Sequence, residues 1–360
     1  MAVVLSGYGV VRRGAEAMLE DLLPRLAPRF EVSVFSRSGA GPGGVRRAAI
    51  PRGLWEPVYL AARPLRKLLD TLYLDPLHVE WTSHLLLSLP ALLRGRYDVV
   101  WHETGLWGGM LLGLLRRPGG YRLLDVAHSH ALGWEVPFAR RRPDLFVAQT
   151  ETLAAEIRRR VAGLRVEVVA QGIDLAHFRP GADKWPLGLP APVVLGVGAL
   201  SPEKRPELLV EAVAESRCSL ALVGEGPLAE RVDRLGAERL GADRYRRLTV
   251  DRNEMPRLYA AADLVALASP REATGRSLVE AMACNKPVVS VDDAVRREVV
   301  GEAGFLVASD AAAGDWAAAF ERAAEEEWAD RPLRQSAPRT LERAVERFGD
   351  LLASLAQERR

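Results

Sequence analysis

The chain of 360 residues is too long for one ordinary hydrophobic core, which favours two domains of about 150–200 residues each. With 48% hydrophobic residues it is expected to fold, and no apolar run reaches the roughly 20 residues that span a bilayer. Met1–Leu5 leads directly into an apolar strand without a charged leader, which argues against a signal peptide. The two cysteines, Cys218 and Cys284, are expected to be reduced thiols of a cytoplasmic protein.

Charge is distributed unevenly along the chain. The net charge of +2 combines an excess of seven positive charges over residues 1–180 with an excess of five negative charges over the remainder. The first half is therefore expected to face something anionic. Only four of the 49 basic residues are lysines, so a lysine inside a motif is more informative than usual.

Short apolar runs alternate with helical patterns along the whole chain. Runs that do not alternate with polar residues predict strands buried on both faces of a parallel sheet, and repeated strand–helix–strand units predict doubly wound α/β domains. Strands are expected, in chain order, at Val3–Leu5, Val32–Phe35, Asp98–Trp101, Leu123–Ala127, Leu145–Ala148, Val166–Ala170, Val193–Val197, Leu220–Val223, Leu248–Val250, Leu264–Ala268, Val288–Val291 and Phe305–Val307. Helices are expected between them, among them Gly14–Leu26, Glu207–Glu215 and Ser277–Cys284.

A cluster of prolines and glycines over Phe178–Pro192 is typical of a linker. It predicts two Rossmann-like domains, residues 1–180 and 181–339, with a last helix in the segment 340–360 that joins the first domain. The segment 36–53, rich in Gly, Arg and Pro, is expected to be a mobile loop. Ligands of doubly wound sheets bind beyond the carboxyl ends of the strands, so the site is expected in a central cleft that the two domains face.

The stretch Ser269–Val289 is the most informative part of the sequence. A loop containing Gly275 follows a strand there, and a helix begins near Arg276. A helix N-terminus binds phosphate through its backbone N–H groups and its dipole. Glu280, one turn into this helix, can hold the hydroxyls of a ribose, and Glu272 in the loop can reach a sugar. On spacing alone, two solvated acids on a helix surface explain the pattern equally well.

These residues resemble the E-x7-E motif of retaining glycosyltransferase family 4, whose members have the GT-B fold. Glu272 and Glu280 match the two acids, and EAMAC follows the second one. The resemblance implies that Glu280 binds the ribose of a nucleotide-sugar donor and that Glu272 is a catalytic residue at the donor sugar. The loop residues expected to bind the diphosphate are Gly275, Arg276, Ser277 and Leu278.

Other segments extend the resemblance over nearly the whole chain, most strongly over residues 166–308. The similar segments are Gln171–Asp174 with Phe178 and Pro180, Gly198–Lys204, Gly224–Pro227 and Leu258–Asp263. The second of these implies that Gly198 and Lys204 lie at the donor, with Lys204 neutralising the diphosphate.

Two positions depart from the family's pattern. Ala199 stands where the family usually has an arginine that clamps the phosphates. Arg205, Arg271 or Arg276 can take over this role, and Arg276 is the best candidate because it directly follows Gly275. Asn285 replaces the glycine after the helix, a milder change because asparagine is the second choice for a left-handed helix C-cap.

The first half carries the residues expected near the donor sugar and the acceptor. The stretch Ser6–Gly14 resembles the family's glycine-rich loop, which places Gly7 and Gly9 at the donor and Gly14 on the acceptor side. His128 matches the family's histidine that contacts the transferred sugar, and we assign it as catalytic. His102 is assigned to the acceptor side. The remaining candidates are His130, which has no assigned role, Asp125, which is expected to be structural, and Trp101, Trp107 and Trp134, which belong either to the core or to a stacking platform for a ring.

No metal-binding constellation is recognised, neither a D-x-D motif nor a zinc spacing. No cofactor is expected, because the helix dipole, the loop amides and Lys204 can meet the charge of the leaving diphosphate. No carboxylate nucleophile is identified in the first domain. The front-face mechanism proposed for the family therefore fits better than a double displacement.

The predicted function is retaining transfer of a sugar from a nucleotide-diphosphate sugar to a glycan, a lipid-linked acceptor or a small molecule. Another GT-B enzyme, such as a nucleotide-sugar epimerase or a sugar phosphorylase, and a non-catalytic nucleotide-sugar-binding relative remain alternatives. An NAD oxidoreductase is disfavoured because Gly7–Arg12 and Gly196–Ser201 both lack the third glycine of a dinucleotide fingerprint. Nucleic-acid binding is disfavoured because basic residues alternate with acids.

The segment Leu54–Leu72 combines apolar and aromatic residues with Arg63, Arg66 and Lys67. The favoured interpretation is an amphipathic helix whose apolar face packs on its own domain. The alternative is a segment that lies on an anionic membrane surface. In that case a cytoplasmic enzyme makes weak, reversible and salt-sensitive contact with the inner face of the membrane.

Overall fold

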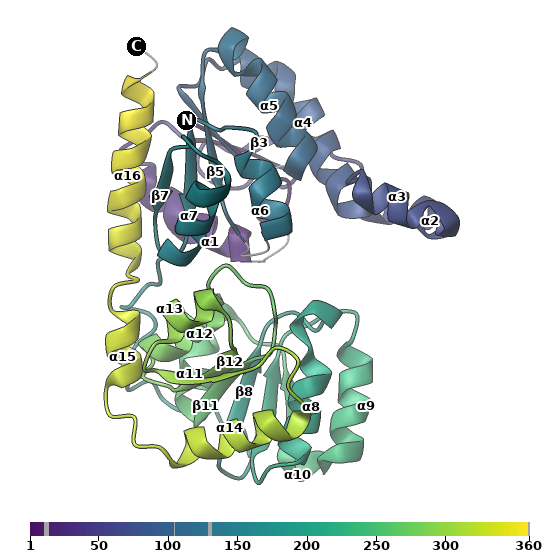
Figure 1. Cartoon of the computed structure of the whole chain (residues 1–360), viewed down its shortest axis with the longest axis vertical. Helices are drawn as coiled ribbons and strands as arrows, with labels where there is room; N and C mark the ends of the chain where they lie inside the picture. The colour runs from purple at the N-terminus through teal and green to yellow at the C-terminus, as the bar shows by residue number, and fades with distance from the viewer. Residues whose placement is uncertain (11–13, 104, 129–131, 359–360) are drawn as a thin grey trace. The chain divides into compact units, whose positions relative to one another are not determined.

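The computed structural model describes residues 1–10, 14–103, 105–128 and 132–358, except for the side chains of residues 132–134 (Figure 1). The chain forms two compact units. Unit 1 comprises Met1–Ala170 and Ala344–Arg360, and unit 2 comprises Gln171–Arg343. In the described residues, no helix is long and apolar enough to cross a membrane.

Unit 1 is built on a parallel sheet with the strand order β3-β2-β1-β4-β5-β6-β7. The strand order reverses at β1, so the carboxyl ends of β1 and β4 form the switch point at which doubly wound sheets bind ligands. The strands are β1 (Ala2–Val4), β2 (Ser33–Ser36), β3 (Val45–Arg46), β4 (Val99–His102), β5 (Arg122–Val126), β6 (Leu145–Ala148) and β7 (Val166–Val168). The helices are α1 (Gly14–Leu26), α2 (Arg52–Ala61), the 3-10 helix η1 (Arg63–Leu65), α3 (Arg66–Thr71), α4 (Pro76–Arg94), α5 (Gly105–Gly119), α6 (Leu132–Ala139), α7 (Glu151–Arg160) and α16 (Leu341–Gln357).

Unit 2 is built on a second parallel sheet with the order β10-β9-β8-β11-β12-β13. Its strands are β8 (Val193–Val197), β9 (Ser219–Val223), β10 (Tyr245–Leu248), β11 (Leu264–Leu267), β12 (Val288–Val291) and β13 (Gly304–Val307). Its helices are η2 (Pro202–Lys204), α8 (Pro206–Ala214), α9 (Ala229–Arg239), α10 (Gly241–Arg244), η3 (Arg252–Glu254), α11 (Met255–Ala261), α12 (Arg276–Ala283), α13 (Ala294–Val300), α14 (Ala313–Glu325) and α15 (Arg331–Ser336).

The sheet of unit 2 is buried on both faces, which explains its continuous apolar strands. Successive residues of a strand point to opposite faces. Leu195 and Val265 accordingly join one hydrophobic cluster, and Val194 and Ala266 join another. The predicted parallel α/β architecture is therefore confirmed in both units.

Helix α16 completes the core of unit 1 although it follows unit 2 in the chain (Figure 1). The ring of Phe348 stacks on Trp101 of β4, with 5.0 Å between ring centroids and an interplanar angle of 20°. The other buried side chains that α16 adds to this core are Ala344, Leu351, Leu352 and Leu355.

The structure corrects the sequence predictions at three places. The segment 36–53 is not a loop throughout, because β3 pairs with β2 inside it, with Phe35 opposite Val45. The strand expected at Leu248–Val250 lies earlier, at Tyr245–Leu248, where it forms the edge strand β10. The segment Leu54–Leu72 is divided between α2, η1 and α3, and none of their residues is buried. The favoured interpretation, a helix whose apolar face packs on its own domain, holds only in part. Helix α2 packs against α4, and Trp55, Tyr59 and Leu69 are half-buried, whereas six large apolar side chains of the segment are exposed.

Candidate functional site

The loop between β11 and α12 in unit 2 carries the E-x7-E residues, and its shape depends on Gly275. Gly275 is the N-cap of α12, with a φ of +76° that favours glycine. A Cβ at this position would lie 2.9 Å from Leu267 Cδ2 and 3.1 Å from Leu278 Cδ1. Glycine therefore allows both the turn and the close packing that make α12 begin at Arg276.

Lys204 and Glu272 are brought together at this loop although 68 positions separate them. The Lys204 ammonium forms an ion pair with Glu272 Oε1, and the same oxygen accepts a hydrogen bond of 2.5 Å from Ser269 Oγ. The side chains of Lys204 and Glu272 are 27% and 17% exposed, so both are accessible to a ligand. A positive and a negative group thus stand side by side at the carboxyl ends of β8 and β11.

Arg296 of α13 holds this loop from inside unit 2. Its side chain is fully buried. The guanidinium donates a hydrogen bond of 3.0 Å to the carbonyl of Ser269 and one of 3.5 Å to the carbonyl of Glu272. The carboxylate of Asp293 lies 2.6 Å from its Nη1. Burial lowers the pKa of the guanidinium, while Asp293 and Glu272 oppose this shift. Arg296 was missed in the sequence, where an arginine on a short helix looks like a surface residue.

Glu280 is held by donors on both of its carboxylate oxygens. Tyr259 Oη donates 2.9 Å to Oε2, and Arg276 Nε donates 2.8 Å to Oε1. Arg252 Nη2 lies 4.0 Å from Oε1. Each carboxylate oxygen has two lone pairs, so Glu280 retains the capacity to accept further hydrogen bonds from ribose hydroxyls. Arg276, the proposed replacement for the missing phosphate clamp, is paired with Glu280 in this structure.

The remaining donor-side residues line the carboxyl end of β8 and the first turn of α12. Gly198 follows β8, and a hollow of about 20 Å³ there is also lined by Ala199 and Lys204. The amide of Leu278 donates 2.9 Å to the carbonyl of Gly275, so it already serves the turn. Ser277 is half-buried. The donor-binding roles of these residues remain predictions.

In unit 1, the glycine-rich loop follows β1 at the switch point of the sheet. A Cβ on Gly7 would lie 2.3 Å from Glu16 Oε1, so glycine allows this backbone to lie against a carboxylate of α1. Gly9 has a φ of +67°, and Gly14 is the exposed first residue of α1. Residues 11–13 of this loop lie outside the described residues.

His128 and Glu103 form a hydrogen-bonded pair after β5 and β4. His128 Nε2 lies 2.7 Å from Glu103 Oε1, and Trp101 Nε1 donates 2.8 Å to the same oxygen. Burial lowers the pKa of the imidazole, but the charge and hydrogen bond of Glu103, with Glu135 and Glu16, outweigh burial and raise the pKa to about 9. His128 is therefore an imidazolium at neutral pH. Glu103 was missed in the sequence because nothing marks it before its partner is known.

His102 lies deeper than its predicted acceptor-side role suggests. Its side chain is 4% exposed and packs so close to α5 that a Cβ on Gly109 would lie 2.9 Å from its ring. Burial lowers its pKa to about 4, against a small opposing effect of Glu103, so the ring is neutral. Its Nε2 lies 3.9 Å from Asp125, whose pKa burial raises well above the ordinary value. His130 and the side chain of Trp134 lie outside the described residues.

A second buried cluster in unit 1 surrounds Glu80 of α4. This carboxylate is 1% exposed and accepts a hydrogen bond of 3.2 Å from Ser6 Oγ at the end of β1. Arg37, after β2, lies 3.2 Å from it, and Arg52, the first residue of α2, lies 3.1 Å from it. Glu80 therefore joins the glycine-rich loop to the start of α2.

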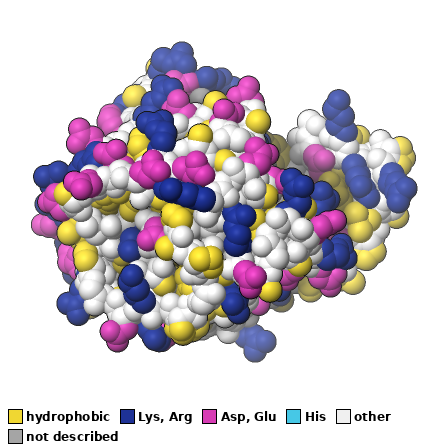
Figure 2. All heavy atoms as spheres, turned by 90° about the horizontal axis from the view of Figure 1, so that it is seen from below, with side chains coloured by type: hydrophobic (Ala, Val, Ile, Leu, Met, Phe, Trp, Pro, Cys, Tyr) yellow, Lys and Arg dark blue, Asp and Glu magenta, His cyan; other side chains and the backbone are white. Residues whose placement is uncertain are grey.

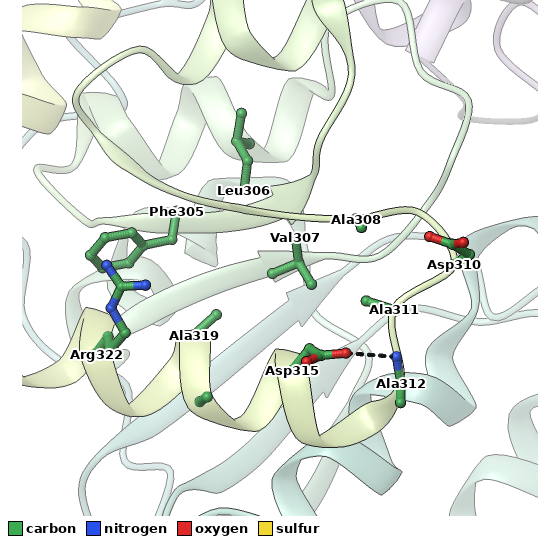
Figure 3. Close-up of a pocket in the computed structure, with 11 residues that line it drawn as sticks. Phe305, Leu306, Val307, Ala308, Asp310, Ala311, Ala312, Asp315, Ala319 and Arg322 are labelled. Atoms are coloured by element: carbon green, nitrogen blue, oxygen red, sulfur yellow. Dashed lines mark hydrogen bonds between the residues drawn. The ribbon is translucent and has the colours of Figure 1, made fainter.

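A separate surface hollow of about 620 Å³ lies between the end of β13 and α14 (Figure 3). Arg322 covers the ring of Phe305 on one side, and Asp315 accepts a hydrogen bond from the amide of Ala312 on the other. None of the predicted site residues lines it. In the described part of the chain, no group of three or more His, Cys, Asp or Glu side chains could hold a metal ion.

Comparison with known proteins shows to which class of enzyme this chain belongs. Residues 182–340 match the family model described as Glycosyl transferases group 1, and residues 12–177 match that of Glycosyltransferase Family 4. The D-inositol 3-phosphate glycosyltransferase of Gordonia bronchialis is 31% identical over 341 residues, which cover 83% of this chain and 73% of that protein.

Two solved structures share the fold over 98% of this chain. The sucrose-phosphate synthase of Thermosynechococcus elongatus has a TM-score of 0.78 at 22% identity and is covered over 98%. The Anabaena protein HepE, in complex with UDP and glucose, has a TM-score of 0.70 at 19% identity and is covered completely. The fold and the similar proteins define a GT-B glycosyltransferase that uses a nucleotide sugar. The chain belongs to glycosyltransferase family 4.

Proposed function

We propose that this enzyme transfers a sugar from a nucleotide-diphosphate sugar with retention of the anomeric configuration and without a metal ion. The observation that carries the proposal is the pairing of Lys204 with Glu272 beside the glycine-capped start of α12. This arrangement presents a cation and a helix N-terminus, both of which stabilise phosphate. Next to them lies a carboxylate that can accept hydrogen bonds from sugar hydroxyls. Glu280, on the first turns of the same helix, binds the ribose.

In the proposed reaction, Lys204 leaves Glu272 for the donor diphosphate and stabilises the negative charge that develops as the bond from the anomeric carbon to the phosphate oxygen breaks. The acceptor hydroxyl attacks the anomeric carbon from the face that the diphosphate leaves. Its proton passes to an oxygen of the departing phosphate, so no protein base is required. The carboxylate of Glu272, released from Lys204, accepts hydrogen bonds from hydroxyl groups of the sugar. His128 contributes a charged hydrogen-bond donor from unit 1.

The first donor nucleotide and acceptor to test follow from the similar proteins. HepE was crystallised with UDP and glucose, which makes UDP-glucose the first donor to test. The Gordonia enzyme is named for D-inositol 3-phosphate, which makes inositol phosphate the first soluble acceptor. We also propose weak, reversible contact of unit 1 with an anionic membrane surface, in keeping with its excess of positive charge.

The decisive experiment is NMR of the product, with nucleotide release measured in parallel. We expect nucleotide diphosphate to appear only when acceptor is present, and the product to have the anomeric configuration of the donor. An inverted product would contradict the proposed stereochemistry. Nucleotide release without acceptor, together with a sugar epimerised at C2, would instead identify a nucleotide-sugar epimerase.

A further inference from the structure

Exposed apolar side chains are concentrated in one part of unit 1. Among the described residues, thirteen large hydrophobic side chains are exposed, and all belong to unit 1. Twelve of them lie between positions 50 and 114: Ile50, Leu54, Val58, Leu60, Leu65, Leu68, Leu72, Leu86, Leu87, Leu93, Trp107 and Leu114. Single exposed leucines are ordinary, but such a concentration marks an interaction surface.

Half of these side chains lie on the segment Arg52–Leu72, which we call the arm; it contains α2, η1 and α3 and extends away from the sheet of unit 1 (Figure 1). No residue of these three helices is buried. Leu54 is 69% exposed, Leu65 54% and Leu68 53%. An apolar surface of this kind costs free energy in water and is stabilised when something apolar covers it.

The arm is held in shape by polar contacts, while five of its six leucines are exposed. Tyr59 Oη donates 2.5 Å to Asp70, and Arg66 Nη2 donates 2.8 Å to the carbonyl of Leu60. At its base, Trp55 Nε1 donates 2.9 Å to the carbonyl of Leu74, and Trp107 Nε1 donates 2.7 Å to that of Leu72. The hydrogen-bonding groups of Trp55, Tyr59 and Trp107 are thus satisfied within the protein, while apolar side chains are left outside, which suits contact with an apolar surrounding.

The charges on the arm indicate what covers it. The whole arm contains four basic residues and two acids, and one of these acids, Asp70, accepts a hydrogen bond from Tyr59. Arg63 and Lys67 are exposed beside Leu65 and Leu68. Figure 2 shows dark-blue basic side chains next to yellow hydrophobic ones on the lobe at the right, which is the arm. A symmetric dimer through the arm would bring two surfaces of the same net positive charge together, which is unfavourable, whereas anionic lipid headgroups complement that charge.

We propose that the arm is the surface through which unit 1 docks on an anionic lipid bilayer. Leu65 and Leu68 enter the boundary between headgroups and acyl chains, and Arg63 and Lys67 contact lipid phosphates. This inference rests on the membrane contact in the proposed function and identifies the surface that makes it. Because Arg52 is tied to Glu80 beside the glycine-rich loop, docking places that loop near the bilayer, where a lipid-linked acceptor is presented.

Flotation of the full chain with lipid vesicles tests the proposal. The vesicles contain phosphatidylcholine with or without phosphatidylglycerol, at low and at high salt. Leu65→Ser with Leu68→Ser should weaken binding to anionic vesicles roughly tenfold or more at both salt concentrations, since both side chains lose apolar burial. Arg63→Gln with Lys67→Gln should weaken it roughly thirtyfold at low salt and far less at high salt.

The matched control is Arg234→Gln with Arg343→Gln, which removes the same charge from exposed positions and should leave binding unchanged. Both positions belong to unit 2, because only the part of α16 from Ala344 onward belongs to unit 1. If the wild type binds and the arm variants bind equally well, the arm is not the docking surface although membrane contact stands. If the wild type does not bind anionic vesicles at low salt, both inferences are overturned. A concentration-dependent dimer that the leucine variants abolish would assign the arm to a second copy of the chain and overturn lipid docking.

Transfer of sugar to a soluble acceptor should remain intact in every variant, because the arm contains none of the donor-site residues. If the wild type binds vesicles but transfers no sugar, the proposed reaction is rejected, whereas the assignment of the docking surface is unaffected.

Discussion

The substitution Glu103→Gln tests how unit 1 sets the charge of His128. In the wild type, burial opposes protonation of the imidazole. Glu103, through its charge and its hydrogen bond of 2.7 Å, outweighs burial together with the charges of Glu135 and Glu16. The pKa consequently rises from 6.5 to about 9. This difference corresponds to about 3 kcal/mol in favour of the protonated folded state.

The sign of the pH dependence follows from linkage. Because the folded pKa lies above the unfolded value, the stabilisation is fully present below pH 6.5 and is lost as pH rises through about 9. In Glu103→Gln, the amide can still accept the hydrogen bond from Trp101, but the charge is gone and burial acts with less opposition. The pKa of His128 should therefore fall to 6.5 or lower, and the variant should be less stable than the wild type near pH 7 but not near pH 10.

The assay is NMR titration of the protein with labelled histidines, in which His128→Gln identifies the resonance. Glu135→Gln is the control, because Glu135 acts on His128 through its charge and should lower the midpoint less than Glu103→Gln does. A His128 midpoint that stays near 9 in Glu103→Gln would refute the reasoning. So would a stability difference from the wild type that is the same at both pH values.

Three further predictions concern the donor site. Lys204→Ala should weaken the binding of nucleotide diphosphate by about 1.5–3 kcal/mol in calorimetry, the worth of a charge-assisted hydrogen bond, while Lys184→Ala, at an exposed position of the same unit, should not. Glu280→Gln should weaken it as well, and unchanged affinity in both Lys204→Ala and Glu280→Gln would remove the donor-site assignment. Transfer activity should survive EDTA. A complete loss of activity that magnesium or manganese restores would show that a metal ion, rather than Lys204 and the N-terminus of α12, neutralises the charge of the diphosphate.

The accuracy with which a strand is predicted follows its apolar content. Val193–Val197 and Val288–Val291 are predicted to the residue, because interior parallel strands are apolar on both faces. The edge strands β13 and β7 are also predicted to within two residues. The other two edge strands are not, because β10 contains two arginines among its four residues and β3 contains only Val45 and Arg46. The amphipathic pattern of Leu54–Leu72 reveals an apolar face but not how much of it the protein itself covers, so the exposure of six of its large apolar side chains was not predicted.

The candidate site shows the same division between local and long-range information. The left-handed C-cap expected at Asn285 is confirmed by its φ of 58°, because a cap depends on local chain geometry. Arg296 and Glu103 could not be predicted, since each acquires its partner only when distant segments meet. The roles of the family-4 residues in binding and catalysis remain predictions, although the structure shows Lys204 and Glu272 in contact.

The position of α16 has a consequence for the order in which the protein matures. The core of unit 1 needs Phe348 and its neighbours, yet the ribosome must first produce all of unit 2 before this helix emerges. Unit 1 is thus synthesised first but can complete its core only after unit 2 has been synthesised. Until then, Trp101 lacks the ring of Phe348 that stacks on it. The apolar surface of unit 1 that α16 covers therefore stays exposed until a segment more than 170 residues further along the chain has been synthesised. During synthesis, unit 1 is thus the unit that is exposed to aggregation for longer.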